Sequence, residues 1–247
     1  MNLKISLLPL LTCFLLISQN ILGQVEFKNL NLNQAIGIAR DSNKKILVYF
    51  YTIPCPACTL LTRQIFEDSE MAKFINSNYI CLKLRGEKEY KKDSAYTSLI
   101  KKYEIGRGFP VVLLLNSDGN FIDLIRGFGD KESYSLALRD YTNNLNTFSY
   151  YQNRIEDNPE DCEAMVQLGM KYHDLYKRDK ALKLFESAVR YLPCKNYALT
   201  WFVLSRFYKQ YGMINKAIFA CEIAIELDPE NSQFQDALNM LKESEKE

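Results

Sequence analysis

The chain has 247 residues, which is enough for one large domain or two small ones. Hydrophobic residues make up 47% of it and charged residues 25%, a balance that permits a buried core and excludes disorder along the whole chain. The 31 basic residues nearly cancel the 30 acidic ones, so a net charge of +1 gives no basis for expecting nucleic acid as a partner.

Residues 1–23 have the pattern of a secretory signal peptide. Lys4 supplies a positive charge, residues 5–17 are mainly apolar, and a short stretch with polar residues ends at Gly23. We predict cleavage after Gly23, so that the mature protein is exported. The apolar run is short for a bilayer span. Membrane contact is therefore expected only if the signal stays uncleaved; lipid attachment at Cys13 is a further alternative.

Residues 25–144 alternate between helical and strand patterns. The strands are rich in β-branched and aromatic residues, and Asn116-Ser117-Asp118-Gly119 is a turn signal between the last two of them. We predict strands at 46–51, 79–84, 110–115 and 121–125, and helices at 33–40, 55–66, 69–76, 94–103 and 131–144. Asn33 is the expected cap of the first helix. This order predicts one mixed sheet with helices on both faces.

From about residue 150 onward the sequence pattern predicts only helices, and this region contains an internal repeat. A shift of 36 residues places Leu168-Gly169 on Leu204-Ser205 and Phe185 on Cys221. This spacing resembles the tetratricopeptide repeat (TPR). The resemblance implies an all-α TPR domain at 161–247 after a helical linker at 148–160, with a surface that binds a protein or peptide.

The repeats are predicted at about 162–195 and 198–231, followed by a closing helix. Three repeats are usually needed for an independent stack. We therefore expect these two repeats to pack against the N-terminal domain, the helix near 150–156 or a second chain.

A Cys-x-x-Cys pair, Cys55 and Cys58, directly follows the first buried strand and opens a helix. Pro56 suits the first helical turn, where its missing N–H is not needed. The helix N-terminus favours the Cys55 thiolate, which is the species that attacks a disulfide sulfur. We predict Cys55 as the catalytic nucleophile, Cys58 as the catalytic resolving cysteine, and a redox-active disulfide between them. A purely structural disulfide is the alternative.

Residues 33–144 resemble the thioredoxin superfamily, through this pair and through Gly108-Phe109-Pro110 ahead of a buried strand. The resemblance implies an α/β thioredoxin-like fold for a domain at 24–147, with a central mixed sheet flanked by helices. It also implies a cis peptide bond before Pro110 and substrate binding by Phe109 and Pro110. Two positions depart from the family: Tyr49 stands where many members have a buried acid, and Pro54 where a tryptophan is common.

The remaining cysteines and the single histidine, His173, do not form a metal-site pattern. We therefore expect no metal and no cofactor. Cys81 and Cys221 read as core thiols. Cys162 and Cys194 begin and end the first repeat, and in an exported protein they could form a disulfide.

These features predict an exported thiol–disulfide oxidoreductase that exchanges disulfides with protein substrates through Cys55 and Cys58. Its TPR domain would bind a partner or client. The alternative is a non-catalytic adapter that uses the TPR surface on a thioredoxin-like scaffold. The periplasm or cell envelope of a Gram-negative bacterium is the expected location.

Overall fold

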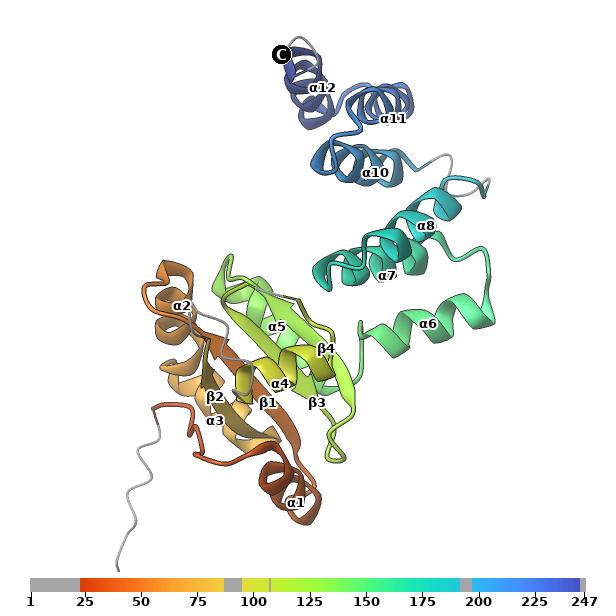
Figure 1. Ribbon diagram of the computed structural model, residues 1–247. Coiled ribbons are helices and arrows are strands. Elements are labelled where there is room, and N and C mark those ends of the chain that lie inside the picture. Colours follow the sequence, from red (N-terminus) through yellow and green to blue (C-terminus); the bar gives the residue numbers. More distant parts are fainter. Residues whose placement is uncertain (1–22, 87–94, 107, 192–196, 245–247) are drawn as a thin grey trace, which may run out of the picture.

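The computed structural model describes residues 23–86, 95–106, 108–191 and 197–244. Residues 1–22 of the predicted signal peptide and Cys194 lie outside the described residues. The chain forms an α/β part followed by a series of helices (Figure 1). Among the described residues, no helix combines the length and the apolar character needed to cross a membrane.

A four-stranded sheet forms the centre of the α/β part. The strands are β1 (Lys45–Tyr51), β2 (Tyr79–Arg85), β3 (Val111–Leu115) and β4 (Phe121–Arg126), in the order β2-β1-β3-β4. β1 is parallel to β2 and antiparallel to β3, which is antiparallel to β4. The predicted mixed sheet is therefore confirmed.

The register of this sheet aligns the ends of three strands. Phe50, near the end of β1, pairs with Val111 at the start of β3, and Val111 pairs with Arg126 at the end of β4. The segments that follow β1, precede β3 and follow β4 consequently meet at one end of the sheet.

Helices cover both faces of the sheet, as predicted. They are α1 (Leu32–Ser42), α2 (Pro56–Leu61), the π-helical η1 (Thr62–Phe66), α3 (Ser69–Asn78), α4 (Ala95–Lys102) and α5 (Lys131–Thr142). Side chains of α1 and α4 share a buried cluster with one face, and those of α2, η1, α3 and α5 share another with the opposite face.

Two helices differ in detail from the prediction. Asn31, rather than Asn33, caps α1: its Oδ1 accepts from the Gln34 N–H at 3.0 Å, while Gln34 Oε1 accepts from the Asn31 N–H at 2.9 Å. This reciprocal capping box satisfies two N–H groups that a cap at Asn33 would leave without partners. The predicted helix 55–66 is α-helical only to Leu61 and continues as η1.

The C-terminal part is all-α, which confirms the predicted helical-repeat class. Its helices are α6 (Phe148–Asp157), α7 (Cys162–Asp174), α8 (Arg178–Ala188), α10 (Ala198–Gln210), α11 (Ile214–Leu227) and α12 (Ser232–Ser244). The small residues of the repeat lie at close helix contacts: the Ser205 hydroxyl donates to the Ala217 carbonyl at 2.7 Å, and Gly169 faces the Phe185 ring.

The first repeat packs against the N-terminal domain, one of the three supports expected for a stack of only two repeats. Ala164 and Leu168 of α7, and Leu175 directly after it, belong to the same buried cluster as the residues of α1 and α4. α6 and α7 lie beside the edge strand β4, and the later helices extend away from the sheet (Figure 1).

A buried ion pair joins α7 to β4. Asp123 is 1% exposed, and its Oδ2 lies 2.7 Å from Lys171 Nζ. Asp123 also accepts from the N–H groups of Leu124 at 2.8 Å and Phe148 at 3.1 Å, and Lys171 Nζ donates to the Tyr141 hydroxyl at 3.1 Å. Side chains or backbone from β4, α5, α6 and α7 therefore meet at this buried ion pair.

The contact between Gly169 and Phe185 yields a stability prediction. A Cβ at Gly169 would lie 2.5 Å from the Phe185 ring, so Gly169→Ala should lower the unfolding free energy by about 1–3 kcal/mol through overpacking. Gly37→Ala is the control, because Gly37 lies inside α1 with no atom within 4 Å of its added Cβ, and should raise stability by up to about 1 kcal/mol. Urea unfolding of both variants measures the difference; equal effects would contradict the packing argument.

Candidate functional site

The cysteine pair sits where the chain leaves β1 and enters α2. Cys55 is the N-cap of α2, with extended backbone, and Pro56 occupies the first turn. Cys55 and Cys58 form a disulfide. Cys55 is partly exposed, whereas Cys58 is 4% exposed. The structure therefore brings the two predicted catalytic residues together with the predicted nucleophile as the accessible sulfur.

The start of α2 supplies a hydrogen-bond donor to the accessible sulfur. The Cys58 N–H donates to Cys55 Sγ at 3.1 Å. The first N–H groups of a helix have no partner within the helix, and the helix dipole favours negative charge there. In the dithiol form the same N–H can stabilise a thiolate at Cys55, which is the reactive species in thiol–disulfide exchange.

The other described cysteines are in different states. Cys81 is a free thiol that is 1% exposed, and burial raises its pKa to about 12. Cys221 is also free and buried, and burial raises its pKa. Both are core thiols, as predicted, and neither provides a thiolate near neutral pH. Cys162 is disulfide-bonded, and Cys194, its predicted partner, lies outside the described residues.

Tyr49, one of the two positions noted as departures from the thioredoxin pattern, contacts the backbone of the cysteine pair. Its ring is 1% exposed, and its hydroxyl donates to the Cys58 carbonyl at 3.2 Å. Burial raises the pKa of Tyr49, so the hydroxyl stays neutral. Tyr49 can hold the backbone of Cys58 in place, but it does not supply the carboxylate that would accept a proton there.

A groove of about 520 Å³ runs beside the disulfide. It is lined by Tyr49, Tyr51, Thr52, Ile53, Pro54, Cys55, Pro56, Cys58, Thr59, Thr62, Arg63, Glu67 and Lys83. Lys83 pairs with Tyr49 in the parallel register of β1 and β2, and its Nζ lies 4.7 Å from the centre of the Tyr51 ring. Lys83 thus places a positive charge over the aromatic floor of the groove.

Lys83 is not among the site residues predicted from the sequence. One signal was available: in Ile80-Cys81-Leu82-Lys83-Leu84 a charged residue interrupts an otherwise apolar strand. Lys83 is exposed because it faces this groove rather than the core.

The Phe109–Pro110 peptide bond is cis, which confirms the predicted isomer. Pro110 is buried and its carbonyl accepts from the Gly127 N–H at 2.8 Å. The Phe109 ring lies 5.5 Å from the Tyr96 ring and packs against Gly86. Phe109 and Pro110 do not line the groove; the sheet register places them next to it, and their role in substrate binding stays a prediction. Ile53–Pro54 is also cis, which the sequence reasoning did not anticipate.

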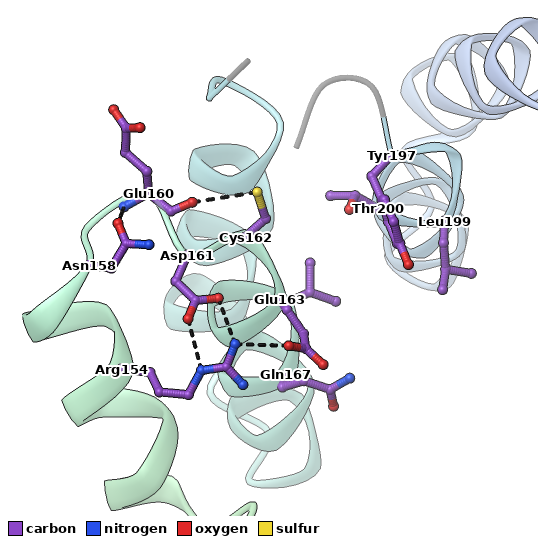
Figure 2. Close-up of a pocket in the computed structure, with 11 residues that line it drawn as sticks. Arg154, Asn158, Glu160, Asp161, Cys162, Glu163, Gln167, Tyr197, Leu199 and Thr200 are labelled. Carbon is purple, nitrogen blue, oxygen red and sulfur yellow. Dashed lines mark hydrogen bonds and ion pairs between the residues drawn. The ribbon is translucent and has the colours of Figure 1, made fainter. Parts of the chain in front are cut away.

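A second groove, of about 750 Å³, lies in the helical part between α7 and α10 (Figure 2). On one side Arg154 makes two contacts with Asp161, at 2.8 and 3.0 Å, and one with Glu163 at 2.8 Å. On the other side Tyr197 and Leu199 are exposed apolar residues. The Arg154 guanidinium is thus paired with Asp161 and Glu163, and Glu160 adds a further carboxylate to the lining of the groove.

The described residues contain no group of three or more His, Cys, Asp or Glu side chains that could hold a metal. His173 packs between two repeat helices, with its ring 5.5 Å from the Phe207 ring and 3.5 Å between Nδ1 and the Tyr211 hydroxyl. The histidine therefore has a packing role in this structure.

Comparison with known proteins gave one family match, and no curated protein matched the chain. Among solved structures, a candidate disulphide-isomerase from Bacteroides thetaiotaomicron is 21% identical, with a TM-score of 0.41, covering 48% of this chain and 93% of that one. The DsbH oxidoreductase is 14% identical, with a TM-score of 0.41 and coverages of 51% and 91%. The first TPR of Spaghetti (RPAP3), bound to an HSP90 peptide, is 15% identical, with a TM-score of 0.39 and coverages of 47% and 86%.

The family match covers the part of the chain that holds the site. Residues 32–142 match the model of the thioredoxin-like domain, and this range includes the Cys55–Cys58 disulfide and the cis-proline Pro110. The fold, the Cys55–Cys58 disulfide and the family match agree, and residues 32–142 of this chain are a thioredoxin-like domain.

Proposed function

We propose that this protein is an exported thiol–disulfide oxidoreductase that exchanges disulfides with protein substrates through Cys55 and Cys58. The observation that carries the proposal is the asymmetry of the pair: Cys55 is accessible at a helix N-cap and receives an N–H, while its disulfide partner Cys58 is buried. Exchange through a mixed disulfide requires one sulfur that a client can reach and a second sulfur, close by, that attacks the mixed disulfide. Cys55 suits the first role and Cys58 the second.

In the reducing direction, the Cys55 thiolate attacks one sulfur of a client disulfide. The client S–S bond breaks, and the released client thiolate takes a proton from water. Cys58, once deprotonated, attacks Cys55 Sγ in the resulting mixed disulfide, and the second client sulfur leaves and is protonated. The client gains two electrons and the protein loses two as the Cys55–Cys58 disulfide forms. A dithiol donor returns the pair to the reduced form; in the oxidising direction the same steps run backwards and a disulfide oxidant restores the pair.

The helical part is proposed to hold a protein or peptide partner. The groove between α7 and α10 supports this, because Tyr197 and Leu199 leave 61% and 53% of their surfaces exposed beside a polar rim. Exposed apolar residues within a groove are typical of protein-binding sites. The signal-peptide pattern of residues 1–23 supports export, with the periplasm or cell envelope of a Gram-negative bacterium as the proposed location.

Capture of a stalled intermediate tests the proposal. In Cys58→Ser the resolving sulfur is absent, so Cys55 should stay bound to a client cysteine. Incubation of the mature Cys58→Ser protein with insulin should give a covalent adduct that dithiothreitol releases, seen by intact-mass spectrometry. Cys221→Ser is the control, because Cys221 is buried in the second repeat, and it should give no adduct. A Cys58→Ser protein that forms no adduct would contradict the exchange function.

A further inference from the structure

Tyr176 of the helical part contacts the loop that leads to Pro110 in the thioredoxin-like domain. Tyr176 follows α7, and the Leu175 side chain beside it is buried in the core of the redox domain. The Tyr176 ring lies directly on Gly106: a Cβ at Gly106 would be 2.4 Å from it. Gly106 precedes the Gly108-Phe109-Pro110 segment, so a residue of the repeat domain contacts the loop that carries the cis-proline.

Arg126 contacts both the helical part and the loop before Pro110. It is the last residue of β4 and pairs with Val111, which follows Pro110. Its Nε donates to the Asp174 carbonyl at 2.8 Å, a guanidinium N–H donates to the Ile105 carbonyl, and its guanidinium lies 4.8 Å from the centre of the Tyr176 ring. Arg126 therefore links the end of α7, the loop before Pro110 and the Tyr176 ring.

The backbone at Tyr176 is in a conformation that a bulky residue rarely adopts. Its φ is +59°, in the left-handed region that favours glycine after a helix. Glycine at this position would avoid the steric cost of the left-handed backbone. We therefore attribute the presence of tyrosine to an interaction of its side chain. The ring contacts Gly106 and Arg126, yet 59% of the residue surface remains exposed. The backbone thus presents an aromatic surface to solvent.

Tyr176 lies at the end of the sheet where the cysteine pair is found. The sheet register brings the ends of β1 and β4 and the start of β3 to one end of the sheet, and Cys55, Phe109 and Arg126 lie on the segments at that end. Tyr176 is seated on Arg126, and its hydroxyl is 3.7 Å from the position of a Cβ on Gly108, the residue before Phe109. Ile53, next to the redox pair, is 58% exposed, so apolar surface is present on both sides of Phe109.

We infer that Tyr176 of the repeat domain is a positioning residue for clients of the thioredoxin-like domain. The client is an extended polypeptide segment with apolar side chains near its cystine, and one of those side chains packs on the exposed face of the Tyr176 ring. A small disulfide does not reach Tyr176. This inference rests on the proposed exchange function, and it makes the repeat domain part of the substrate site rather than only a separate partner-binding module.

The test compares three disulfides with the reduced mature protein. They are hydroxyethyl disulfide, a disulfide-linked peptide with leucine and phenylalanine around each cysteine, and a matched peptide with serine and glycine at those places. Tyr176→Gly removes the ring and suits the left-handed backbone, so the fold should be retained. We expect its KM for the apolar peptide to rise about fivefold or more, with kcat unchanged, as the loss of one aromatic contact implies. The rates with hydroxyethyl disulfide and the polar peptide should equal those of the parent protein.

Two further variants separate positioning from structure. Tyr176→Phe keeps the ring and should restore the KM for the apolar peptide. Phe219→Ala, at a residue of similar exposure (62%) on α11, should leave all three reactions unchanged. The inference is overturned if Tyr176→Gly reacts with the apolar peptide as the parent does, or if its rate with hydroxyethyl disulfide falls equally. If the parent protein reacts with none of the three disulfides, the proposed exchange function itself fails, which is a separate result.

Discussion

Replacing Cys55 by serine should abolish exchange with every disulfide substrate. The serine hydroxyl does not ionise near neutral pH, and the remaining sulfur, Cys58, is only 4% exposed. We expect the rate of insulin reduction to fall by a factor on the order of 10³ or more, the scale seen when a catalytic nucleophile is removed. Turbidity from the released insulin chains measures this rate.

The matched comparison is between the two cysteines of the pair. Cys58→Ser should retain the first step and form the mixed disulfide, whereas Cys55→Ser should form none. Cys81→Ser serves as a second control, because burial raises the pKa of the Cys81 thiol to about 12 and keeps it out of exchange. If Cys55→Ser kept its activity while Cys58→Ser lost the adduct, the assignment of nucleophile and resolving cysteine would be reversed.

Replacing Lys171 by methionine should strongly destabilise the fold. The change leaves the Asp123 carboxylate, with a side chain only 2% exposed, without its cation at 2.7 Å. Removing one partner of a buried ion pair costs about 3–5 kcal/mol, because the other charge stays buried without compensation. Urea unfolding of the mature protein should show this loss at pH 8.

The pH dependence of this effect follows from the pKa of Asp123. Burial is the largest influence and raises this pKa from 3.8 to about 6, against the opposing effects of Lys171 and two backbone N–H groups. Because the folded value lies above the unfolded one, the contribution of Asp123 to stability is fully present below about pH 4 and is lost as the pH rises through 6. Without Lys171 the pKa should rise further, so Lys171→Met should be more destabilised at pH 8 than at pH 5.

Two controls accompany this prediction. Lys177→Met removes an ion pair with Glu104 that is exposed to solvent, and it should change stability little because water screens such pairs. Adding Asp123→Asn to Lys171→Met removes the orphaned charge but keeps an oxygen that can accept from the Leu124 or Phe148 N–H, and it should restore much of the lost stability. Equal losses in Lys171→Met and Lys177→Met would contradict the assignment of the buried pair as the link between sheet and repeats.

Much of the local structure could be predicted from sequence patterns, because it depends on neighbours along the chain. Alternating and continuous apolar runs identified the four strands, and the cysteine spacing after a strand identified the pair that the structure joins. The 36-residue repeat identified the all-α part, since the small residues Gly169 and Ser205 mark close helix contacts in both copies. Where the prediction failed locally, as at Asn31, a neighbouring residue offered a better set of hydrogen bonds.

Only the tertiary structure determines the contacts and the burial of the charged and aromatic residues between the α/β part and the helical part. Asp123 is the one charged residue in the apolar run 121–125, and nothing within the strand shows how its charge is satisfied; α6 and α7 cover it and supply its partners. Tyr176 reads as an ordinary turn residue, and only the docking of α7 places it on Gly106. The burial and the ion pairing of a side chain depend on which segments, distant in sequence, contact each other in the fold. The residue pattern within one segment does not show which segments those are. The sequence by itself therefore determined the elements and the redox pair, while the contact between the domains determined the buried ion pair and the surface around the site.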